Sequence, residues 1–206
     1  MYREVFFDNP FETNCWLLAA EGSDDAVVVD PGFSAQVVRR MLEAAGKRPV
    51  AVLATHGHFD HVGSAGALCD DDLPLYIHEA DELALTDPAA WGSGYPVPPA
   101  PAKDVRTVVD GEVLEFAGFR VEVVHTPGHT PGSVCFRTDA FLLSGDLVFR
   151  GAIGRSDFPN SSPRDMERSL RRFLSLPDPL PVWPGHGPET TVGLERRSNP
   201  FLLELA

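Results

Sequence analysis

Three histidines and one aspartate, all common metal ligands, lie within six residues of one another: His56, His58, Asp60 and His61. In an α-helix, which turns by about 100° per residue, His56 and Asp60 would share one face. His58 and His61 would point to nearly the opposite face, so one helix could not gather all four side chains. A loop can gather them, because Gly57 permits sharp changes of backbone direction. The spacing therefore predicts two adjacent metal positions supplied by one turn.

This cluster has two alternative interpretations, a solvated group of histidines that arose by chance and a structural zinc site. Packed histidines and a carboxylate would be costly to desolvate without a cation between them. Structural zinc sites favour cysteine, and this segment contains none. We therefore favour a metal site that performs chemistry.

Three further candidate ligands lie far along the chain, each directly after a glycine at the end of a predicted strand: His129, Asp146 and His186. A ligand on a loop at a strand end is a common way for a scaffold to position chemistry. Together with the first cluster they make five histidines and two aspartates. All of them bind through nitrogen or oxygen, which suits zinc, iron or manganese without choosing among these metals.

Short apolar runs between turn residues predict strands in both halves of the chain, followed by helices. The predicted strands cover 3–7, 15–20, 26–30, 50–55, 74–78, 106–110, 113–116, 120–126, 133–138, 141–146 and 181–186. The predicted helices cover 34–45, 62–72, 79–85, 163–174 and 193–205. Pro200 is expected to break the last helix, and the prolines of 86–104 predict a long loop. This order suits an α+β fold of one domain, 1–206, built as an αββα sandwich.

The motifs together resemble those of the metallo-β-lactamase superfamily. The match consists of THxHxDH, GHTxGS, GD and GH, in the order that the superfamily has, at 55–61, 128–133, 145–146 and 185–186. Asp30, which begins an Asp-Pro-Gly turn after a predicted strand, matches the superfamily's early aspartate. The resemblance covers almost the whole chain, and it implies the αββα fold.

The resemblance also implies a role for each residue of the motifs. Two groups of three would each hold one metal ion: His56, His58 and His129, and then Asp60, His61 and His186. Asp146 would bridge the two ions, and Asp30 would steady a ligand histidine. Two divalent ions, zinc first with iron or manganese as alternatives, would make a bridging hydroxide available near neutral pH. That hydroxide would attack a carbonyl group, while Asp60 orients it and moves a proton.

Within the superfamily, three segments resemble the glyoxalase II-like hydrolases (hydroxyacylglutathione hydrolases): 145–149, 153–159 and 190–202. Those enzymes cleave thioesters such as S-lactoylglutathione. Arg155 falls where that family has a basic residue that contacts the thiol cofactor, and a salt bridge that fixes the loop is the alternative. The chain has no room for the C-terminal helical domain of the larger members, and Asp157 or Phe158 stands in place of an expected tyrosine. We therefore expect a compact, single-domain hydrolase of a small-molecule thioester, with the thiol carrier left open.

Other functions are alternatives to this one. Persulfide dioxygenases share the fold and much of the motif, but they use a single iron held by two histidines and an aspartate. The complete second group of ligands favours two metals over one. A metal-stabilised binding domain without activity is a third hypothesis. Antibiotic hydrolysis is not expected, because the thiolate ligand of many true β-lactamases is replaced by Gly145-Asp146.

The composition, with 43% apolar and 23% charged residues, is ordinary for a globular protein. The formal charge of −13 disfavours binding to nucleic acid or to anionic lipid, and no apolar run is long enough to cross a membrane. Cys15, Cys69 and Cys135 form no CxxC pair and predict buried, reduced thiols. These thiols, and an N-terminal segment without the features of a secretory signal, predict a cytoplasmic protein. The sequence leaves the oligomeric state open.

Overall fold

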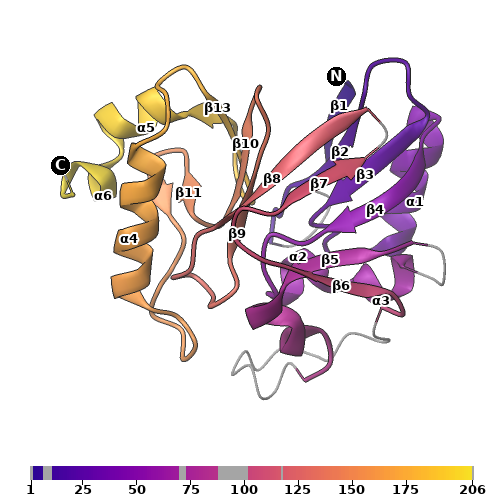
Figure 1. Cartoon of the computed structure of the whole chain (residues 1–206), viewed down its shortest axis with the longest axis horizontal. Coiled ribbons are helices and arrows are strands. Elements are labelled where there is room, and N and C mark those ends of the chain that lie inside the picture. Colours follow the sequence, from indigo (N-terminus) through magenta and orange to yellow (C-terminus); the bar gives the residue numbers. More distant parts are fainter. Residues whose placement is uncertain (1, 7–10, 70–72, 88–101, 117, 206) are drawn as a thin grey trace.

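Two β-sheets pack against each other in the computed structural model, which describes residues 2–6, 11–69, 73–87, 102–116 and 118–205 (Figure 1). The first sheet has the strand order β1-β2-β3-β4-β5-β6, and the second has the order β14-β13-β10-β9-β8-β7. The strands of the first sheet are β1 (Tyr2–Phe6), β2 (Cys15–Ala19), β3 (Asp25–Val29), β4 (Arg48–Leu53), β5 (Leu75–His78) and β6 (Val105–Val108). Those of the second are β7 (Val113–Phe116), β8 (Phe119–His125), β9 (Val134–Arg137), β10 (Leu142–Gly145), β13 (Pro181–Pro184) and β14 (Thr190–Thr191). A short hairpin joins β11 (Val148–Phe149) to β12 (Ala152–Ile153).

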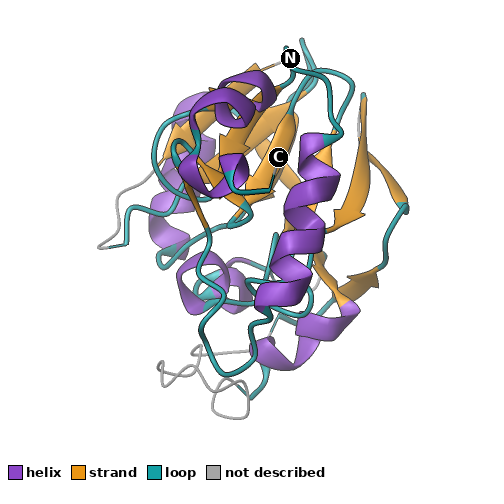
Figure 2. Ribbon diagram, turned by 90° about the vertical axis from the view of Figure 1, so that its left-hand side faces the viewer, coloured by secondary structure: helices purple, strands orange, loops and turns teal. Residues whose placement is uncertain are grey.

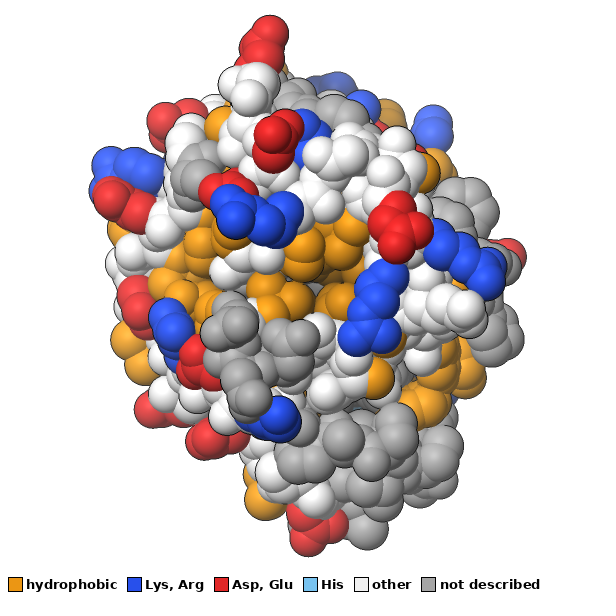
Figure 3. All heavy atoms as spheres, turned by 90° about the vertical axis from the view of Figure 1, so that its right-hand side faces the viewer, with side chains coloured by type: hydrophobic (Ala, Val, Ile, Leu, Met, Phe, Trp, Pro, Cys, Tyr) orange, Lys and Arg blue, Asp and Glu red, His pale blue; other side chains and the backbone are white. Residues whose placement is uncertain are grey.

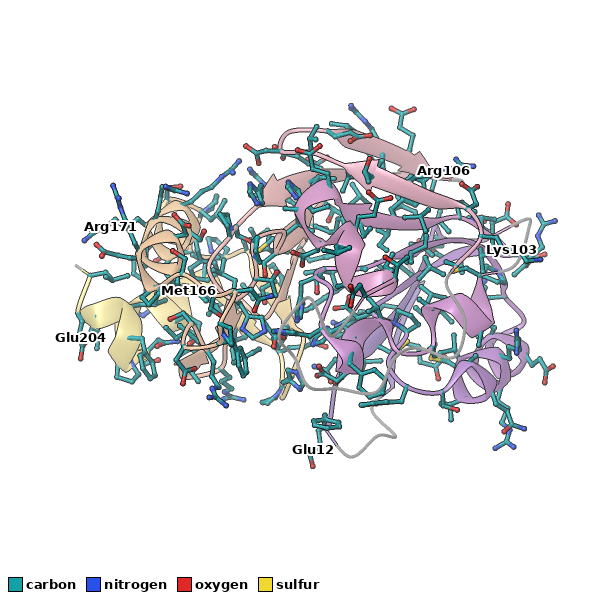
Figure 4. The ribbon with its side chains drawn as sticks, turned by 90° about the horizontal axis from the view of Figure 1, so that it is seen from below. Glu12, Lys103, Arg106, Met166, Arg171 and Glu204 are labelled. Carbon is teal, nitrogen blue, oxygen red and sulfur yellow. The ribbon has the colours of Figure 1, made fainter. Side chains whose placement is uncertain are left out.

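Helices cover the outer face of each sheet. The first sheet is covered by α1 (Ala35–Ala45), α2 (Phe59–Val62), α3 (Ala65–Leu68) and the 3-10 helix η1 (Glu79–Leu85). The second is covered by α4 (Pro163–Leu174), α5 (Val192–Ser198) and α6 (Pro200–Leu203), which lie in front of its strands in Figure 2. The helix α4 buries Met166 and directs Arg171 outward, as Figure 4 shows. Among the described residues, no helix is long and apolar enough to cross a membrane.

Strand alternation explains how one sheet can face two cores. All of β2 is buried, and its side chains point alternately to opposite faces. Leu17 packs towards the helices that cover the first sheet, whereas Trp16 and Leu18 pack between the two sheets. A third core lies between the second sheet and α4, where Leu170 and Phe173 are buried. The molecule is therefore an αββα sandwich, and the predicted fold class is confirmed.

The strands that precede the candidate ligands end at one edge of each sheet. In the first sheet β3 and β4 are parallel, so their carboxyl ends lie side by side. In the second sheet β8 and β10 are both antiparallel to β9, and β13 is parallel to β10. The segments that follow all five strands therefore emerge where side chains from both sheets can meet.

Most predicted helices have the signals that the sequence indicated. Ser34 caps α1 by accepting a hydrogen bond from the backbone N–H of Val37, and Gly46 ends the helix in the left-handed conformation. The predicted helix 163–174 coincides with α4, and the break at Pro200 separates α5 from α6. Positions 88–101 of the predicted loop 86–104 lie outside the described residues.

The single helix predicted over 62–72 is wrong. Two short helices, α2 and α3, take its place, and α2 starts three residues earlier, inside the ligand motif. Ser64 lies between them, where its hydroxyl donates to the carbonyl oxygen of Pro31 and its backbone N–H donates to that of Gly32. These hydrogen bonds connect the interruption between α2 and α3 to the loop after β3. Helix propensity depends on the local sequence and does not reveal such contacts. Positions 70–72 lie outside the described residues.

Charges of both signs are mixed on the face that carries α1. Figure 3 shows hydrophobic side chains there among Lys, Arg, Asp and Glu. A groove of about 490 Å³ on this side is lined by Leu42, Leu68 and Leu73 together with Arg39, Glu43 and Lys47. This mixture differs from the single-sign surface that binding to nucleic acid favours.

Candidate metal centre

The seven predicted ligands come from the ends of strands in both sheets and meet in one place. Four of them follow β4 in the loop and first turn of α2: His56, His58, Asp60 and His61. The others follow β8, β10 and β13: His129, Asp146 and His186. Their potential ligand atoms fall into three groups, and within each group they lie within 4.8 Å of one another. The structure therefore brings together side chains that are up to 130 positions apart in the sequence.

The first trio consists of three imidazoles, His56, His58 and His129. Nδ1 of His58 lies 3.1 Å from Nε2 of His56 and 2.8 Å from Nε2 of His129. All three side chains are buried. Three ring nitrogens thus converge on one point, away from bulk water.

The second trio consists of Asp60, His61 and His186. Nε2 of His186 lies 3.2 Å from Oδ2 of Asp60 and 3.3 Å from Nε2 of His61. His61 is fully buried, whereas the side chains of Asp60 and His186 are 17% and 26% exposed. The second trio is therefore the more open of the two.

Asp146 lies between the two trios. Its Oδ2 is 3.3 Å from Nε2 of His129, and its Oδ1 is 3.4 Å from Nε2 of His61. That Oδ1 is buried and accepts no hydrogen bond from the described residues. A buried carboxylate oxygen without a hydrogen-bond donor is unfavourable, so this position is suited to a cation.

Hydrogen bonds to the ring nitrogen that faces away from the trios orient the imidazoles of His61, His129, His186 and His56. Nδ1 of His61 donates to Oδ2 of Asp30 at 2.9 Å, and Nδ1 of His129 donates to the carbonyl oxygen of Arg155 at 2.7 Å. Nδ1 of His186 similarly donates to the carbonyl oxygen of Phe11 at 3.0 Å. A ring that donates through Nδ1 presents the lone pair of Nε2.

The fourth oriented ring is that of His56, and Asp30 acts on it through Thr55. The Thr55 hydroxyl donates to Oδ2 of Asp30 at 2.8 Å, so its oxygen is left to accept from Nδ1 of His56 at 3.1 Å. The backbone N–H of Thr55 also donates to Oδ1 of Asp30. Asp30 therefore contacts His61 directly and His56 through Thr55.

The electrostatics of the trios are opposite. Burial, followed by the neighbouring imidazoles, lowers the pKa of His58 to about 3 and holds the pKa of His56 well below its usual value. In the second trio burial again opposes charge on His61, but the carboxylates of Asp60, Asp146 and Asp30 outweigh it and raise its pKa to about 10. His56 and His58 are therefore neutral at physiological pH, whereas the second trio attracts positive charge.

Two glycines permit the close approach of these loops. A Cβ atom at Gly185 would lie 2.3 Å from Oδ1 of Asp146, and one at Gly145 would lie 2.7 Å from Cβ of Thr55. Gly145 also has a φ of 48°, in the left-handed region that other residues rarely adopt. The glycine that precedes each of these two ligands is therefore required by space, and at Gly145 also by backbone conformation.

The donor set fits divalent metal ions. Nitrogen and carboxylate oxygen ligands suit zinc, iron and manganese, and the outward hydrogen bonds leave a lone pair of each oriented imidazole directed inward. The Oδ1 of Asp146, which accepts no hydrogen bond from the described residues, points to the same need for a cation. This histidine and aspartate cluster could therefore hold metal ions.

Sequence reasoning missed two residues that contact the second trio. The hydroxyl of Thr13 donates to Oδ2 of Asp60 at 2.9 Å, and Thr13 forms an isolated β-bridge with His186. The carbonyl oxygen of Phe11 accepts from His186. Both residues belong to the turn after β1, which contains no chemical motif, so nothing in the sequence pointed to them.

Arg155 presents its backbone to the centre and its side chain to solvent. Its carbonyl oxygen orients His129, while its side chain is 65% exposed and pairs with Asp157 at 2.9 Å. The guanidinium also lies over the ring of Phe158, 4.4 Å from its centroid, and that ring is 5.3 Å from the ring of His58. The loop-fixing ion pair is therefore present, next to the first trio.

The fold and this centre are those of a known class of metal-dependent proteins. The family model described as the metallo-beta-lactamase superfamily matches residues 8–186, and the chain belongs to that superfamily. Its members bind divalent metals, and the relatives below place this chain among the metallo-hydrolases.

Related sequences cover nearly the full length of the chain. An uncharacterized protein of Mycobacterium tuberculosis is 42% identical over 211 residues, which is 94% of each chain. The probable metallo-hydrolase YqgX of Bacillus subtilis is 37% identical, over 94% of this chain and 93% of its own length. The hydroxyacylglutathione hydrolase GloC of Haemophilus influenzae is 34% identical over 98% of both chains.

Solved structures show the same architecture. The B3 metallo-beta-lactamase BLEG-1 superposes with a TM-score of 0.88 at 35% identity, over 98% of this chain and 99% of its own. TTHA1623, in a di-iron-bound form, gives 0.81 at 40% identity, over 98% of this chain and 100% of its own. ETHE1 from Myxococcus xanthus gives 0.80 at 26% identity, over 99% of this chain and 85% of its own.

Proposed function

We propose that this protein hydrolyses small-molecule thioesters, of which S-lactoylglutathione is the model, with two divalent metal ions. The position of Asp146 carries the proposal, because one buried carboxylate contacts both trios and has an oxygen that accepts no hydrogen bond. The likeness to the hydroxyacylglutathione hydrolase GloC supports the substrate class. The di-iron form of TTHA1623 supports two ions and makes iron an alternative to zinc, with manganese the other.

Each residue then has a defined role. The first trio would hold one ion, the second trio the other, and Asp146 would contact both. Such ions, when bound, lower the pKa of coordinated water to about 7 and stabilise the negative charge that develops on a carbonyl oxygen. Asp30 would keep His61 in the tautomer that presents Nε2. None of these roles needs a serine or cysteine nucleophile.

Asp60 is the proposed proton-handling residue. Burial alone would raise its pKa, but His61 and His186 outweigh that effect and hold the pKa well below its usual value. The carboxylate is therefore ionised at neutral pH, and the Thr13 hydroxyl fixes the direction of its Oδ2. An ionised and oriented carboxylate within the second trio can orient the attacking water and hold its proton.

Arg155 is the proposed contact for the thiol part of the substrate. Its ion pair with Asp157 is exposed, and exposed ion pairs contribute little to stability. A carboxylate of the substrate can therefore replace Asp157 at modest cost. The guanidinium lies over Phe158, whose ring contacts those of His58 and His129, so it is close to the first trio.

A mononuclear iron persulfide dioxygenase is the alternative function. The resemblance of the sequence motifs to those of persulfide dioxygenases supports it. A complete second trio in contact with Asp146 favours two ions over one. Metal content and reaction type separate the two functions.

The decisive experiment pairs elemental analysis of the purified protein with a thiol-release assay on S-lactoylglutathione. We expect two metal ions per chain and thiol release, and Asp60→Asn should lower the rate by about 10²–10⁴-fold. One iron with oxygen uptake on glutathione persulfide would instead establish the dioxygenase. A metal-containing protein that turns over neither substrate, in which Asp60→Asn changes nothing measurable, would be a binding domain. A β-lactam added as a third substrate tests the activity named for BLEG-1.

We further propose a cytoplasmic location and no nucleic-acid or membrane partner. Among the described residues all three cysteines are buried and none forms a disulfide, which suits a reducing compartment. The net charge of −13 supports the absence of polyanionic partners. Cell fractionation with a tagged full-length chain tests the location.

A further inference from the structure

We propose that Asp81, on η1, is a positioning residue that joins the two loops of the first trio and holds its three imidazoles in place for a metal ion. The inference rests on the first trio being a metal site, which is part of the proposed function. It concerns a residue that belongs to no motif and touches no candidate ligand side chain.

Asp81 accepts hydrogen bonds from both loops. Its Oδ2 accepts from the backbone N–H of Gly57 at 2.9 Å and from the hydroxyl of Thr130 at 2.7 Å. Its Oδ1 accepts from the backbone N–H of Gly132 at 2.6 Å. Gly57 lies between His56 and His58, and Thr130 directly follows His129. One fully buried carboxylate therefore sets the separation of the segments that carry all three imidazoles.

A second set of contacts connects η1 to the loop that follows His129. The ring of His78, which caps η1 by accepting from the backbone N–H of Ala80, stacks on the ring of His125 at a centroid distance of 4.0 Å. Nε2 of His125 donates to the carbonyl oxygen of Pro131 at 2.9 Å. Asp81 therefore binds Thr130 and Gly132, and His125 binds Pro131, which lies between them. These two histidines, which the metal centre does not use, support the same loop from the side.

The chemistry of the three partners requires a carboxylate at position 81. All three groups donate, and an ionised carboxylate is the only side chain of this size that is purely an acceptor. An asparagine would direct its NH₂ group at the backbone N–H of either Gly57 or Gly132, so one hydrogen bond to a loop must be lost. The fit is also close, because a Cβ atom at Gly132 would lie 2.6 Å from Cγ of Asp81.

A purely structural role does not account well for this arrangement. No cation compensates the Asp81 carboxylate among its hydrogen-bond partners, which are two backbone N–H groups and a hydroxyl. Burying a carboxylate in this way is unfavourable, and an apolar residue could fill the same space. A buried carboxylate at position 81 is explained if the two loops must be held at a fixed separation so that their ligands can bind one ion.

Glu195 on α5 offers a matched control elsewhere in the fold. It is also fully buried, and it accepts from the hydroxyl of Thr190, the backbone N–H of Gly151 and the side-chain amide of Asn199. Asp81→Asn and Glu195→Gln therefore remove the same charge from equivalent environments. Of these two carboxylates, only that of Asp81 binds the loops of the first trio.

The test titrates metal-free wild type, Asp81→Asn and Glu195→Gln with Co²⁺ and with Zn²⁺ against a chelator, and records thermal unfolding of each. We expect Asp81→Asn to weaken binding of one ion by roughly 10–100-fold and to alter the visible Co²⁺ absorption bands, which report ligand geometry. Glu195→Gln should lower the unfolding temperature to a similar extent but leave the affinities and the bands unchanged.

Gly132→Ala is a second variant that keeps the carboxylate. Its methyl group would displace Asp81 from its partners, so affinity should fall in the same direction, and the double variant with Asp81→Asn should lose less than the two losses combined. If neither Asp81→Asn nor Gly132→Ala changes affinity or spectrum, or if Glu195→Gln changes them equally, the positioning role is wrong. If the wild type binds no metal, the proposed function itself fails. If Asp81→Asn does not fold, Gly132→Ala alone decides the outcome.

Discussion

The two trios lie side by side but provide opposite environments for a cation. The first consists of three buried imidazoles, with the pKa of His58 lowered to about 3. The second combines a carboxylate with two imidazoles, is partly exposed, and raises the pKa of His61 to about 10. A metal ion entering the first trio meets His56 and His58 in the neutral form, whereas one entering the second must displace a proton from His61. Asp146 contacts both trios, so it is the residue through which they would act together.

The largest effect is expected from Asp146→Asn, which removes the carboxylate that both trios share. Thioester hydrolysis should fall by at least about 10³-fold, because the amide is a poor ligand and both ions lose one contact. The metal-free protein should also lose some stability, because the Asp146 carboxylate contributes to the raised pKa of the protonated His61. Thiol release and thermal unfolding with and without metal measure both effects. A variant that keeps two ions and full activity would show that the trios do not depend on Asp146.

The pair His58→Ala and His186→Ala tests whether the trios are separate sites. Each variant removes one ligand of a single trio, so each should retain about one of two metal ions. Elemental analysis after gel filtration gives the stoichiometry, and wild type treated in the same way is the control. Loss of both ions from either variant would mean that the two trios form one cooperative site.

The pH dependence of metal affinity should differ between the trios. His61 has a pKa of about 10, so below that pH an ion must displace its proton, and affinity for the second trio should rise by roughly tenfold per pH unit between pH 6 and 8. His58 has a pKa of about 3 and the pKa of His56 is also well below its usual value, so the first trio presents both ligands neutral, and its metal affinity should rise less steeply with pH than that of the second trio. Calorimetric titration at several pH values, with chelator competition, measures both slopes. Equal slopes of metal affinity against pH for the two trios would contradict the predicted difference between them.

The smallest effect is expected from Thr13→Val, which removes the hydrogen bond to Oδ2 of Asp60. One such bond contributes about 1 kcal/mol, which corresponds to roughly fivefold in affinity. Only the second trio should weaken. Thr138→Val is a matched control, because Thr138 is a buried threonine in the turn between β9 and β10. A loss at the first trio, or an equal loss in the control, would contradict the expectation.

The spacing of residues allowed much of the fold and of the candidate centre to be predicted. Apolar alternation located the strands, and the Ser34 cap and Gly46 bounded α1 as expected. Four of the seven candidate ligands were recognisable from their close spacing after a predicted strand, and the other three from a preceding glycine at a strand end. The structure brings their ligand atoms together in three groups, within 4.8 Å of one another in each. The helix predicted over 62–72 was wrong, because contacts with the loop after β3 interrupt it at Ser64.

The residues that could not be predicted act through the backbone or across the fold. Thr13 meets Asp60 across 47 positions, and Asp81 meets Gly132 across 51. The carbonyl oxygen of Phe11 orients His186, and a carbonyl group is common to every residue type. Such contacts leave no pattern of residue types along the chain, since neither partner needs an unusual neighbour in sequence.

The sequence by itself determined which atoms are available to bind a cation and the alternation of strands that makes a sandwich. The resemblance already implied two trios with Asp146 between them, but only the tertiary structure decided how different their surroundings are and which groups orient the ligands. The reason is physical: donor chemistry belongs to each side chain, whereas pKa, tautomer and separation depend on what folding places around it.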